Sequence, residues 1–320
     1  MNFLSHLRVE RFIEEHTDNV SDFIIDDDKD GVIIKAGSSY SGDDYIEIKG
    51  FNGEEIPFKI SNESNVKGIQ FSNCQLCSLY GLPKELKWIN LKSVALETFR
   101  GIPNVLNILR MEKCYIPENL EGIELVRWKP TLASYSAIKI KPMLYINETN
   151  IKSLGRFHSS ESFYEIRIIR NDKLSGELEI NVNAERYTIE ENCNITSVKL
   201  GGSPKAIDIN RNEKLNSFEI ESLNNVAYAS FERNEFTTIG SFKELFNFNS
   251  LLKERDIHLK GNPFTDEDFE KLKEIRRKID RNTALKLNLF IDSDLNHKHI
   301  TAERMLKYSA FRDMLMSEIQ

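Results

Sequence analysis

Acidic residues near the N-terminus are the first candidates for metal chemistry. Residues 26–31 read DDDKDG, which is the spacing of oxygen ligands and glycine that opens an EF-hand calcium loop. The twelfth position of such a loop requires a bidentate glutamate, but here it is Gly37. Apolar, β-branched segments flank the run at 23–25 and 32–34, so we predict a β-hairpin with an Asp-Gly turn. The alternative is a weak calcium site formed by Asp26, Asp28 and Asp30.

Two further clusters contain metal-binding or redox-active residue types. Cys74 and Cys77 form a C-x-x-C pair, which can be half of a zinc site or a redox dithiol. No second close Cys/His pair completes four ligands, so we predict that these cysteines pack in the core. Residues 292–299 could chelate a metal or form a solvated loop. The candidate ligands there are Asp292, Asp294, His297 and His299.

Motifs that identify common enzymes are absent from the sequence. It has no P-loop, no G-x-G-x-x-G after a strand, no H-E-x-x-H and no G-x-S-x-G. We therefore expect a non-catalytic protein without a cofactor. An enzyme whose site lies outside the repeats is one alternative.

A repeat of about 20 residues determines where any site would be positioned. Gly81-Leu82-Pro83 returns as Gly101-Ile102-Pro103. Apolar residues around both tripeptides fit the template L-x-x-L-x-L-x-x-N/C-x-L. We place the last strand position of the successive repeats at Phe71, Leu91, Met111, Trp128, Ile146, Ile168, Ile189, Ile209, Phe231 and Leu259.

The residue three places after each of these positions supports the same register. Five consecutive coils have asparagine there, and two earlier coils have cysteine, as the template requires. A buried carboxamide can satisfy unpaired backbone groups of its own coil and of a neighbouring coil. We therefore predict an α/β solenoid of about ten coils with a parallel, concave sheet. These positions are Cys74, Val94, Cys114, Thr131, Thr149, Asn171, Asn192, Asn212, Asn234 and Asn262.

Both ends of the chain differ from the repeats and are expected to cap them. Residues 1–65 contain 6 Lys/Arg and 15 Asp/Glu, and we assign them to an acidic α+β cap with a helix over 3–15 and short strands over 22–60. The repeats then occupy 66–264, and 265–320 form a helical cap that begins at a capping threonine, Thr265. A second helix is expected at about 301–318. Its apolar face contains Met305, Tyr308, Phe311, Leu315 and Ile319.

The repeat register also predicts which side chains lie on the open surface of the sheet. Residues between the two core positions of each strand point outward. Three arginines and a tyrosine occupy this position in four neighbouring coils, and both residue types are common in interface hot spots. Interspersed glutamates leave a mixed polar surface as the alternative. The candidate partner-binding residues are Arg110, Lys113, Arg127, Lys129, Tyr145, Arg167 and Arg170.

The Gly-Leu-Pro and Gly-Ile-Pro motifs, with a shifted echo at 116–120, give the chain a family resemblance. It resembles the short, Leu-Pro-containing leucine-rich repeats of secreted effectors from Gram-negative bacteria. The repeat resemblance covers 66–264 and the Leu-Pro subtype about 79–120. It implies a concave scaffold that binds another macromolecule, usually a protein. Many such effectors add a ubiquitin-ligase domain with a catalytic cysteine, but here the last cysteine is Cys193, so that activity is not implied.

Together these features favour a protein that captures a partner with an acidic surface, in the manner of a bacterial or phage-borne effector or inhibitor. A nucleic-acid binder that uses the same basic strip is the alternative, although the repeats are nearly neutral, which argues against it. Four cysteines in 320 residues indicate a reducing, cytoplasmic setting. The N-terminus lacks a secretory pattern, and no apolar run is long enough for a membrane span. The oligomeric state is left open.

Overall fold

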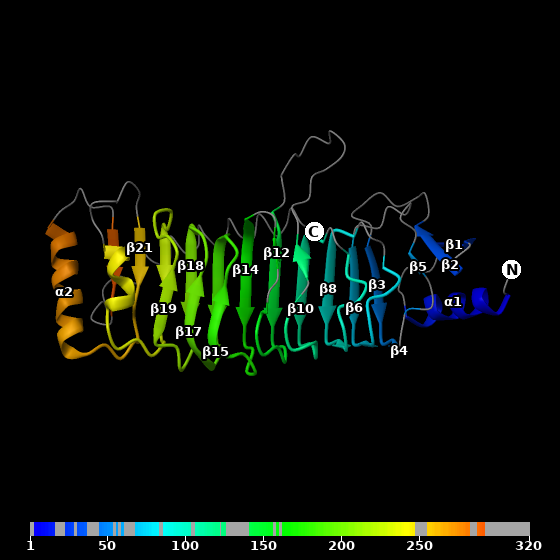
Figure 1. Ribbon diagram of the computed structural model, residues 1–320, viewed down its shortest axis with the longest axis horizontal. Helices are drawn as coiled ribbons and strands as arrows, with labels where there is room; N and C mark the ends of the chain where they lie inside the picture. The colour runs from blue at the N-terminus through cyan, green and yellow to red at the C-terminus, as the bar shows by residue number, and fades with distance from the viewer. Residues whose placement is uncertain are drawn as a thin grey trace, which may run out of the picture.

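Eleven parallel strands form one main sheet in the computed structural model (Figure 1). The strands lie in the order of the chain, each beside its predecessor, which makes the protein a parallel β-solenoid and confirms the predicted solenoid architecture. Their bounds are β3 Tyr45–Lys49, β6 Gly68–Ser72, β8 Trp88–Lys92, β10 Ile108–Glu112, β12 Met143–Asn147, β14 Phe163–Ile169, β16 Ala184–Glu190, β18 Ala206–Asn210, β20 Tyr228–Ser230, β21 Arg255–His258 and β22 Leu287–Phe290. The structure describes residues 3–16, 23–28, 31–36, 45–53, 56, 59–60, 68–82, 86–103, 106–121, 123–125, 141–155, 158–159, 162–246, 255–281 and 287–291.

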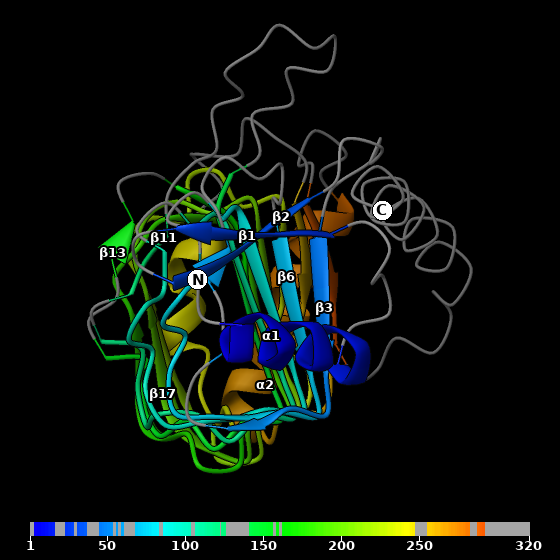
Figure 2. The ribbon, with the colours of Figure 1, turned by 90° about the vertical axis from the view of Figure 1, so that its right-hand side faces the viewer.

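Shorter parallel sheets lie on the opposite side of the solenoid and close its cross-section (Figure 2). Each main strand presents two apolar residues to the interior, such as Ile89 and Leu91 on β8, and both are fully buried. The core is therefore a column of aliphatic side chains enclosed between the main sheet and the return strands. The return strands are β4 Asn52–Gly53, β7 Gln75–Leu76, β9 Ala95–Leu96, β11 Glu124–Leu125, β13 His158–Ser159, β15 Ser175–Ile180, β17 Asn194–Leu200 and β19 Ser217–Ile220.

A ladder of buried asparagines holds the turns that follow the main strands. The backbone N–H of Asn171 donates to Oδ1 of Asn192 at 2.9 Å, and the N–H of Asn192 donates to Oδ1 of Asn212 at 3.0 Å. The same bond continues to Asn234 and Asn262 at 2.9 and 3.1 Å. The carboxamide nitrogens of Asn192 and Asn212 in turn donate to backbone carbonyls of their own and the preceding coil. The predicted role of the asparagine column is confirmed.

The residue just before this column adopts a left-handed conformation in coil after coil. The chain must reverse its direction at this point, and a φ of 52–57° at each non-glycine position achieves this. At the two ends the same position is glycine, Gly50 and Gly261, for which this conformation carries no steric cost. The non-glycine residues of this column are Asn73, Ser93, Lys113, Glu148, Arg170, Glu191, Arg211 and Arg233.

Helices and a hairpin lie at the ends of the stack. Helix α1 (Phe3–His16) precedes the antiparallel hairpin of β1 (Phe23–Asp28) and β2 (Gly31–Ala36), so the predicted hairpin is confirmed; β5 (Lys59–Ile60) pairs with β2. Helix α2 (Asp266–Arg281) begins at Thr265, whose hydroxyl accepts the N–H of Asp268 at 3.3 Å. A 3₁₀ helix, η2 (Gly240–Phe246), packs beside β19.

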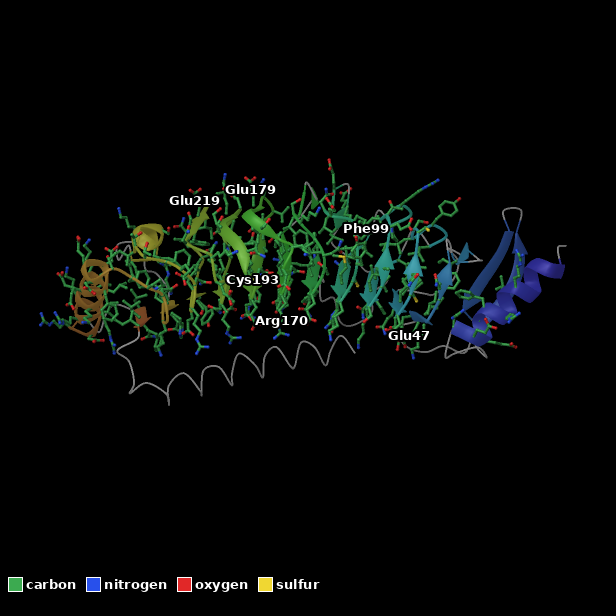
Figure 3. All side chains as sticks on the ribbon, turned by 90° about the horizontal axis from the view of Figure 1, so that it is seen from below. Glu47, Phe99, Arg170, Glu179, Cys193 and Glu219 are labelled. Atoms are coloured by element: carbon green, nitrogen blue, oxygen red, sulfur yellow. The ribbon has the colours of Figure 1, made fainter. Side chains whose placement is uncertain are left out.

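Three sequence-based expectations differ from the structure. Strand β10 pairs directly with β12, so the main sheet contains no strand at Trp128, and residues 126–140 lie outside the described part of the chain. The main sheet also extends past both boundaries expected for the repeats, to β3 and β22. Finally, the strands form a nearly straight row in two perpendicular views (Figures 1 and 3), whereas we expected a concave sheet. We call the side of the main sheet that is turned away from the core the outer face.

Candidate interaction surface

One outward-pointing residue from each main strand lies between its two buried positions. In Figure 3, Glu47 and Arg170 lie on the side of the main sheet, whereas Glu179 and Glu219 lie on the opposite side with the return strands. Because the strands pair in register, the outward residues form a continuous line across the sheet. This outer row consists of Glu47, Gln70, Asn90, Arg110, Tyr145, Arg167, Thr188, Asp208, Ser230, His258 and Phe290.

Two arginines in this row flank a tyrosine on three adjacent strands. Arg110, Tyr145 and Arg167 are register partners on β10, β12 and β14. The guanidinium carbons of the two arginines lie 5.8 and 5.9 Å from the centroid of the tyrosine ring, within the range of cation–π attraction. We call these three residues the Arg–Tyr–Arg cluster.

A buried glutamate on β14 fixes the tyrosine in this cluster. The hydroxyl of Tyr145 donates to Oε2 of Glu165 at 3.2 Å, and the hydroxyl of Thr188 donates to Oε1 at 3.2 Å. Burial, followed by the negative charge of Glu165, raises the pKa of Tyr145 above its ordinary value, so the phenol remains a donor at neutral pH. Nε of Arg167 lies 3.6 Å from Glu165, but this buried nitrogen has no hydrogen-bond partner within the described residues.

The outer face changes its charge towards the C-terminal end of the stack. Asp208 on β18 lies 3.6 Å from the guanidinium of Arg186. Burial raises the pKa of Asp208 to about 6, against the attraction of Arg186. Just after β20, Glu232 lies 3.5 Å from Nδ1 of His258 on β21. The carboxylates here are thus each paired with a basic side chain, and the guanidinium of Arg167 in the Arg–Tyr–Arg cluster likewise lies beside the carboxylate of Glu165.

Charged residues of alternating sign occupy the left-handed column at the ends of the same strands. Arg170 lies 3.5 Å from Glu148 and 2.6 Å from Glu191, and Arg211 lies 2.7 Å from Glu191. Hydrogen bonds from Arg170 and Arg211 hold the pKa of Glu191 below its usual value. Exposed ion pairs of this kind contribute about 1 kcal/mol or less each, so their importance here is the charge pattern that they present.

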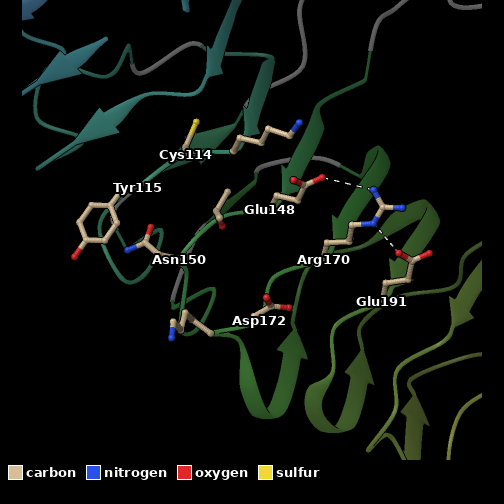
Figure 4. A pocket seen from close by; sticks show the side chains of 10 residues that line it. Cys114, Tyr115, Glu148, Asn150, Arg170, Asp172 and Glu191 are labelled. Atoms are coloured by element: carbon tan, nitrogen blue, oxygen red, sulfur yellow. Dashed lines mark hydrogen bonds and ion pairs between the residues drawn. The ribbon is translucent and has the colours of Figure 1, made fainter. Parts of the chain in front are cut away.

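A pocket of about 740 Å³ opens beside these turns, on the coils of β10, β12 and β14 (Figure 4). At this place the spacing between neighbouring main strands along the chain is longest, and Asn150 bridges the two coils. Its Oδ1 accepts the N–H of Ile116 at 2.6 Å and its Nδ2 donates to the carbonyl of the same residue at 2.9 Å. The pocket is lined by Lys113, Cys114, Tyr115, Glu148, Thr149, Asn150, Arg170, Asp172, Lys173 and Glu191.

The lining of the pocket is mostly polar and charged. Its lining combines three basic and three acidic side chains with the exposed ring of Tyr115. Cys114 is not a prepared nucleophile, because burial raises the pKa of its thiol and its Sγ donates to the carbonyls of Leu91 and Glu112 at 3.2 and 3.1 Å. Within the described residues, neither Lys113 nor Lys173 forms an ion pair.

The predicted binding residues thus separate into three groups. Arg110, Tyr145 and Arg167 come together in the Arg–Tyr–Arg cluster. Lys113 and Arg170 lie at the strand ends, where both line the pocket. The other two, Arg127 and Lys129, lie outside the described residues.

Two further residues of this surface escaped the sequence interpretation. Glu165 and Arg186 lie two residues before the outer row, so they also point outward by the strand alternation. The sequence interpretation considered only the outward position between the two core residues of each strand, so it did not include these two residues.

The other candidate sites are resolved only in part. Cys74 is buried and its Sγ donates to the carbonyls of Ile48 and Ser72 at 3.4 and 3.3 Å, which confirms its predicted packing role. Within the described residues, no group of three His, Cys, Asp or Glu side chains is arranged to bind a metal. The cluster at 292–299 lies outside those residues.

Comparison with known proteins gave no match to a family model, to a curated protein or to a solved structure. Neither described α-helix has the length and apolar character needed to cross a membrane.

Proposed function

We propose that this protein is a non-catalytic binding protein that captures a protein partner on the outer face of its main sheet. The observation that carries the proposal is the Arg–Tyr–Arg cluster, which places two guanidinium groups beside one aromatic ring on three hydrogen-bonded strands. Arginine and tyrosine are enriched in interface hot spots. A parallel sheet holds them in place before binding, which reduces the entropy lost on association.

The expected partner surface is acidic. A guanidinium binds carboxylates through two parallel hydrogen bonds, and the cluster places two guanidinium groups on either side of the Tyr145 ring. Lys113 and Arg170 extend the positive side chains to the strand ends. The carboxylates of Glu148 and Glu191 between them favour a protein over a nucleic acid, because phosphate binding needs a predominantly positive footprint.

We further propose that the repeats belong to the leucine-rich type, in which a scaffold of this kind acts as an effector or inhibitor in the cytoplasm. The 20- to 22-residue spacing of the asparagine column from Asn171 to Asn234, its last step of 28 residues to Asn262, and its hydrogen bonds support the repeat type. All four cysteines are free thiols, which supports a reducing setting.

The test is an affinity capture with charge-reversed variants of the full chain. We expect Arg110→Glu/Arg167→Glu to lose at least ten-fold in affinity for the captured protein, with an unchanged circular dichroism spectrum. The control, Arg8→Glu/Arg277→Glu, makes the same change in net charge on the exposed surfaces of α1 and α2. Equal capture by both variants would refute the proposal. Capture of nucleic acid with a steep salt dependence would replace it with the nucleic-acid alternative.

A further inference from the structure

The pocket beside the turns of β10, β12 and β14 lies where a regular backbone pairing of the solenoid is interrupted. In the three coils before it, the residue that follows the turn position donates its N–H to the turn-position carbonyl of the preceding coil. These bonds hold the return side of neighbouring coils together. They run from Gln75 to Phe51 at 2.8 Å, from Ala95 to Cys74 at 2.9 Å and from Tyr115 to Val94 at 2.8 Å.

The pairing does not continue from Cys114 to the coil of β12. Within the part of the chain that the structure describes, neither the N–H of Asn150 nor the carbonyl of Cys114 forms a hydrogen bond. Instead, the side chain of Asn150 bonds to the N–H and the carbonyl of Ile116 at 2.6 and 2.9 Å (Figure 4). Its Oδ1 takes the place that a backbone carbonyl holds one coil earlier, where the N–H of Leu96 donates to Tyr115 at 2.7 Å. A carboxamide thus fills one position between the two coils, and the next position is open.

The open position is complementary to a peptide group. It has a free N–H on Asn150 and a free carbonyl on Cys114, and both residues line the pocket. Cys114 is only 4% exposed, and buried backbone groups are nearly always paired. An extended peptide supplies an acceptor and a donor together, and main-chain bonds of this kind are a common mode of peptide recognition. The pocket volume of about 740 Å³ lies within the usual range of ligand sites, about 300–1,000 Å³.

The unpaired charges of the pocket indicate which side chains such a peptide carries. Arg170 lies 3.5 and 2.6 Å from the two glutamates of the lining, so these three side chains neutralise one another in part. Lys113 and Lys173 form no ion pair within the described residues. Asp172 is the remaining carboxylate of the lining. Two unpaired ammonium groups against one carboxylate favour acidic side chains on the ligand.

We propose that this pocket binds an extended, acidic segment of a partner protein. The backbone of the segment pairs with the N–H of Asn150 and the carbonyl of Cys114, and its carboxylates bind Lys113 and Lys173. This inference deepens the proposed function, because it names the element of the partner that is recognised, and it rests on that function for the origin of the segment. The pairing and charge arguments themselves do not depend on the outer face.

Selection of random linear octapeptides displayed on phage, with the full chain as bait, tests the pocket without any partner. We expect the enriched peptides to contain at least two Asp or Glu residues, and the best of them to bind as a free, labelled peptide in fluorescence anisotropy. Lys113→Glu/Lys173→Glu should weaken this binding at least ten-fold. The matched control, Arg8→Glu/Arg277→Glu, makes the same change in net charge on α1 and α2 and should keep the affinity of the wild type. Circular dichroism verifies the fold of both variants, and Lys113→Gln/Lys173→Gln provides the comparison if charge reversal prevents folding.

Singly N-methylated copies of the selected peptide test the backbone pairing. Methylation at one central position should weaken binding at least ten-fold, because it removes the N–H that donates to the carbonyl of Cys114. Methylation of the two neighbouring residues should have a much smaller effect, since their N–H groups point to the opposite edge of an extended chain. The same small effect at every position would overturn the proposed pairing.

The proposal is also overturned if no peptide is enriched, if the enriched peptides lack acidic residues, or if Lys113→Glu/Lys173→Glu binds as tightly as the wild type. Displacement of the peptide by an equal concentration of inorganic phosphate would replace it with a simple anion site. Peptide binding by a protein that captures no partner on the outer face would keep the pocket and lose the proposed function. Capture that needs Arg110 and Arg167, without peptide binding, would do the reverse.

Discussion

Replacement of Asn192 by alanine tests whether the asparagine ladder holds the solenoid together. The side chain is fully buried, and its Oδ1 accepts the backbone N–H of Asn171 at 2.9 Å. Its Nδ2 donates to the carbonyls of Ile168 and Glu190, both at 3.0 Å. The carbonyl of Glu190 keeps a second bond, from the N–H of Arg170 at 3.1 Å. The N–H of Asn171 loses its acceptor and stays buried.

The expected cost follows from these contacts. One orphaned buried N–H costs about 1–3 kcal/mol, and each of the two lost bonds to carbonyls costs about 0.5–1.5 kcal/mol. Asn192→Ala should therefore lower the free energy of unfolding by about 2–6 kcal/mol, a large part of the stability of an ordinary protein. Asn192→Asp should be at least as destabilising, because it keeps the acceptor but buries a carboxylate and removes both donors.

Urea unfolding followed by circular dichroism and by fluorescence measures this change, and coincident transitions justify a two-state treatment. Hydrogen exchange provides a local measurement, since the amide of Asn171 should lose protection first. The matched control is Asn216→Ala on an exposed loop, which should stay within about 0.5 kcal/mol of the wild type. A loss below about 1 kcal/mol for Asn192→Ala would refute the view that the ladder carries stability.

Three further predictions concern other single sites. The pKa of Asp208 is raised from 3.8 to about 6 in the folded state, so between these pH values the folded protein holds a proton on Asp208 that the unfolded protein has lost. The free energy of unfolding should therefore fall as the pH rises through this window. Asp208→Asn should remove up to about 3 kcal/mol of that decrease, measured by urea unfolding at pH 4 and pH 7; an equal decrease in the variant and the wild type would contradict this prediction. Ser93 has a φ of 53°, a conformation that glycine adopts freely and a β-branched residue does not. Ser93→Gly should therefore leave the free energy of unfolding unchanged or raise it, whereas Ser93→Val should lower it by about 1–2 kcal/mol. A glycine variant that is less stable than the valine variant in chemical denaturation would show that the turn is not strained. Thr149→Asn should extend the ladder by one coil, accept the N–H of Cys114 and raise the midpoint of thermal unfolding, and a lower midpoint would show that this slot cannot hold a carboxamide.

The regular part of the fold was predictable because two independent columns repeat along the sequence. The strand positions repeat as apolar residues, and the turn position repeats as asparagine from Asn171 onward. Each column has a physical cause, namely burial between two sheets and the need to satisfy inward-facing backbone groups. Together they gave the correct register from β14 to β20, and with it the outward position of Arg167.

The irregular part was not predictable in the same way. Between Met111 and Ile146 the chain is long enough for an additional coil, and Trp128 matched the apolar column, so we expected a strand there. Pairing of β10 with β12 excludes it from the main sheet. Residue type alone does not distinguish a coil from an insertion when the turn position offers no asparagine. For this reason the sequence identified the residues of the Arg–Tyr–Arg cluster but not the direct contact between Arg110 and Tyr145.

The position of the candidate surface follows from a change in how the turns are held. Coils before β14 have thiol, valine or threonine side chains at the turn position, and Cys74 and Cys114 donate only weak S–H bonds to carbonyls. Coils from Asn171 onward have carboxamides that both donate and accept. The Arg–Tyr–Arg cluster and the pocket lie across this boundary, so carboxamide bonds hold the turns on one side of the surface and weaker S–H bonds hold turns on the other. At the long connection after β10, the carboxamide of Asn150 takes over this role, because it accepts from the N–H of Ile116 and donates to the carbonyl of the same residue.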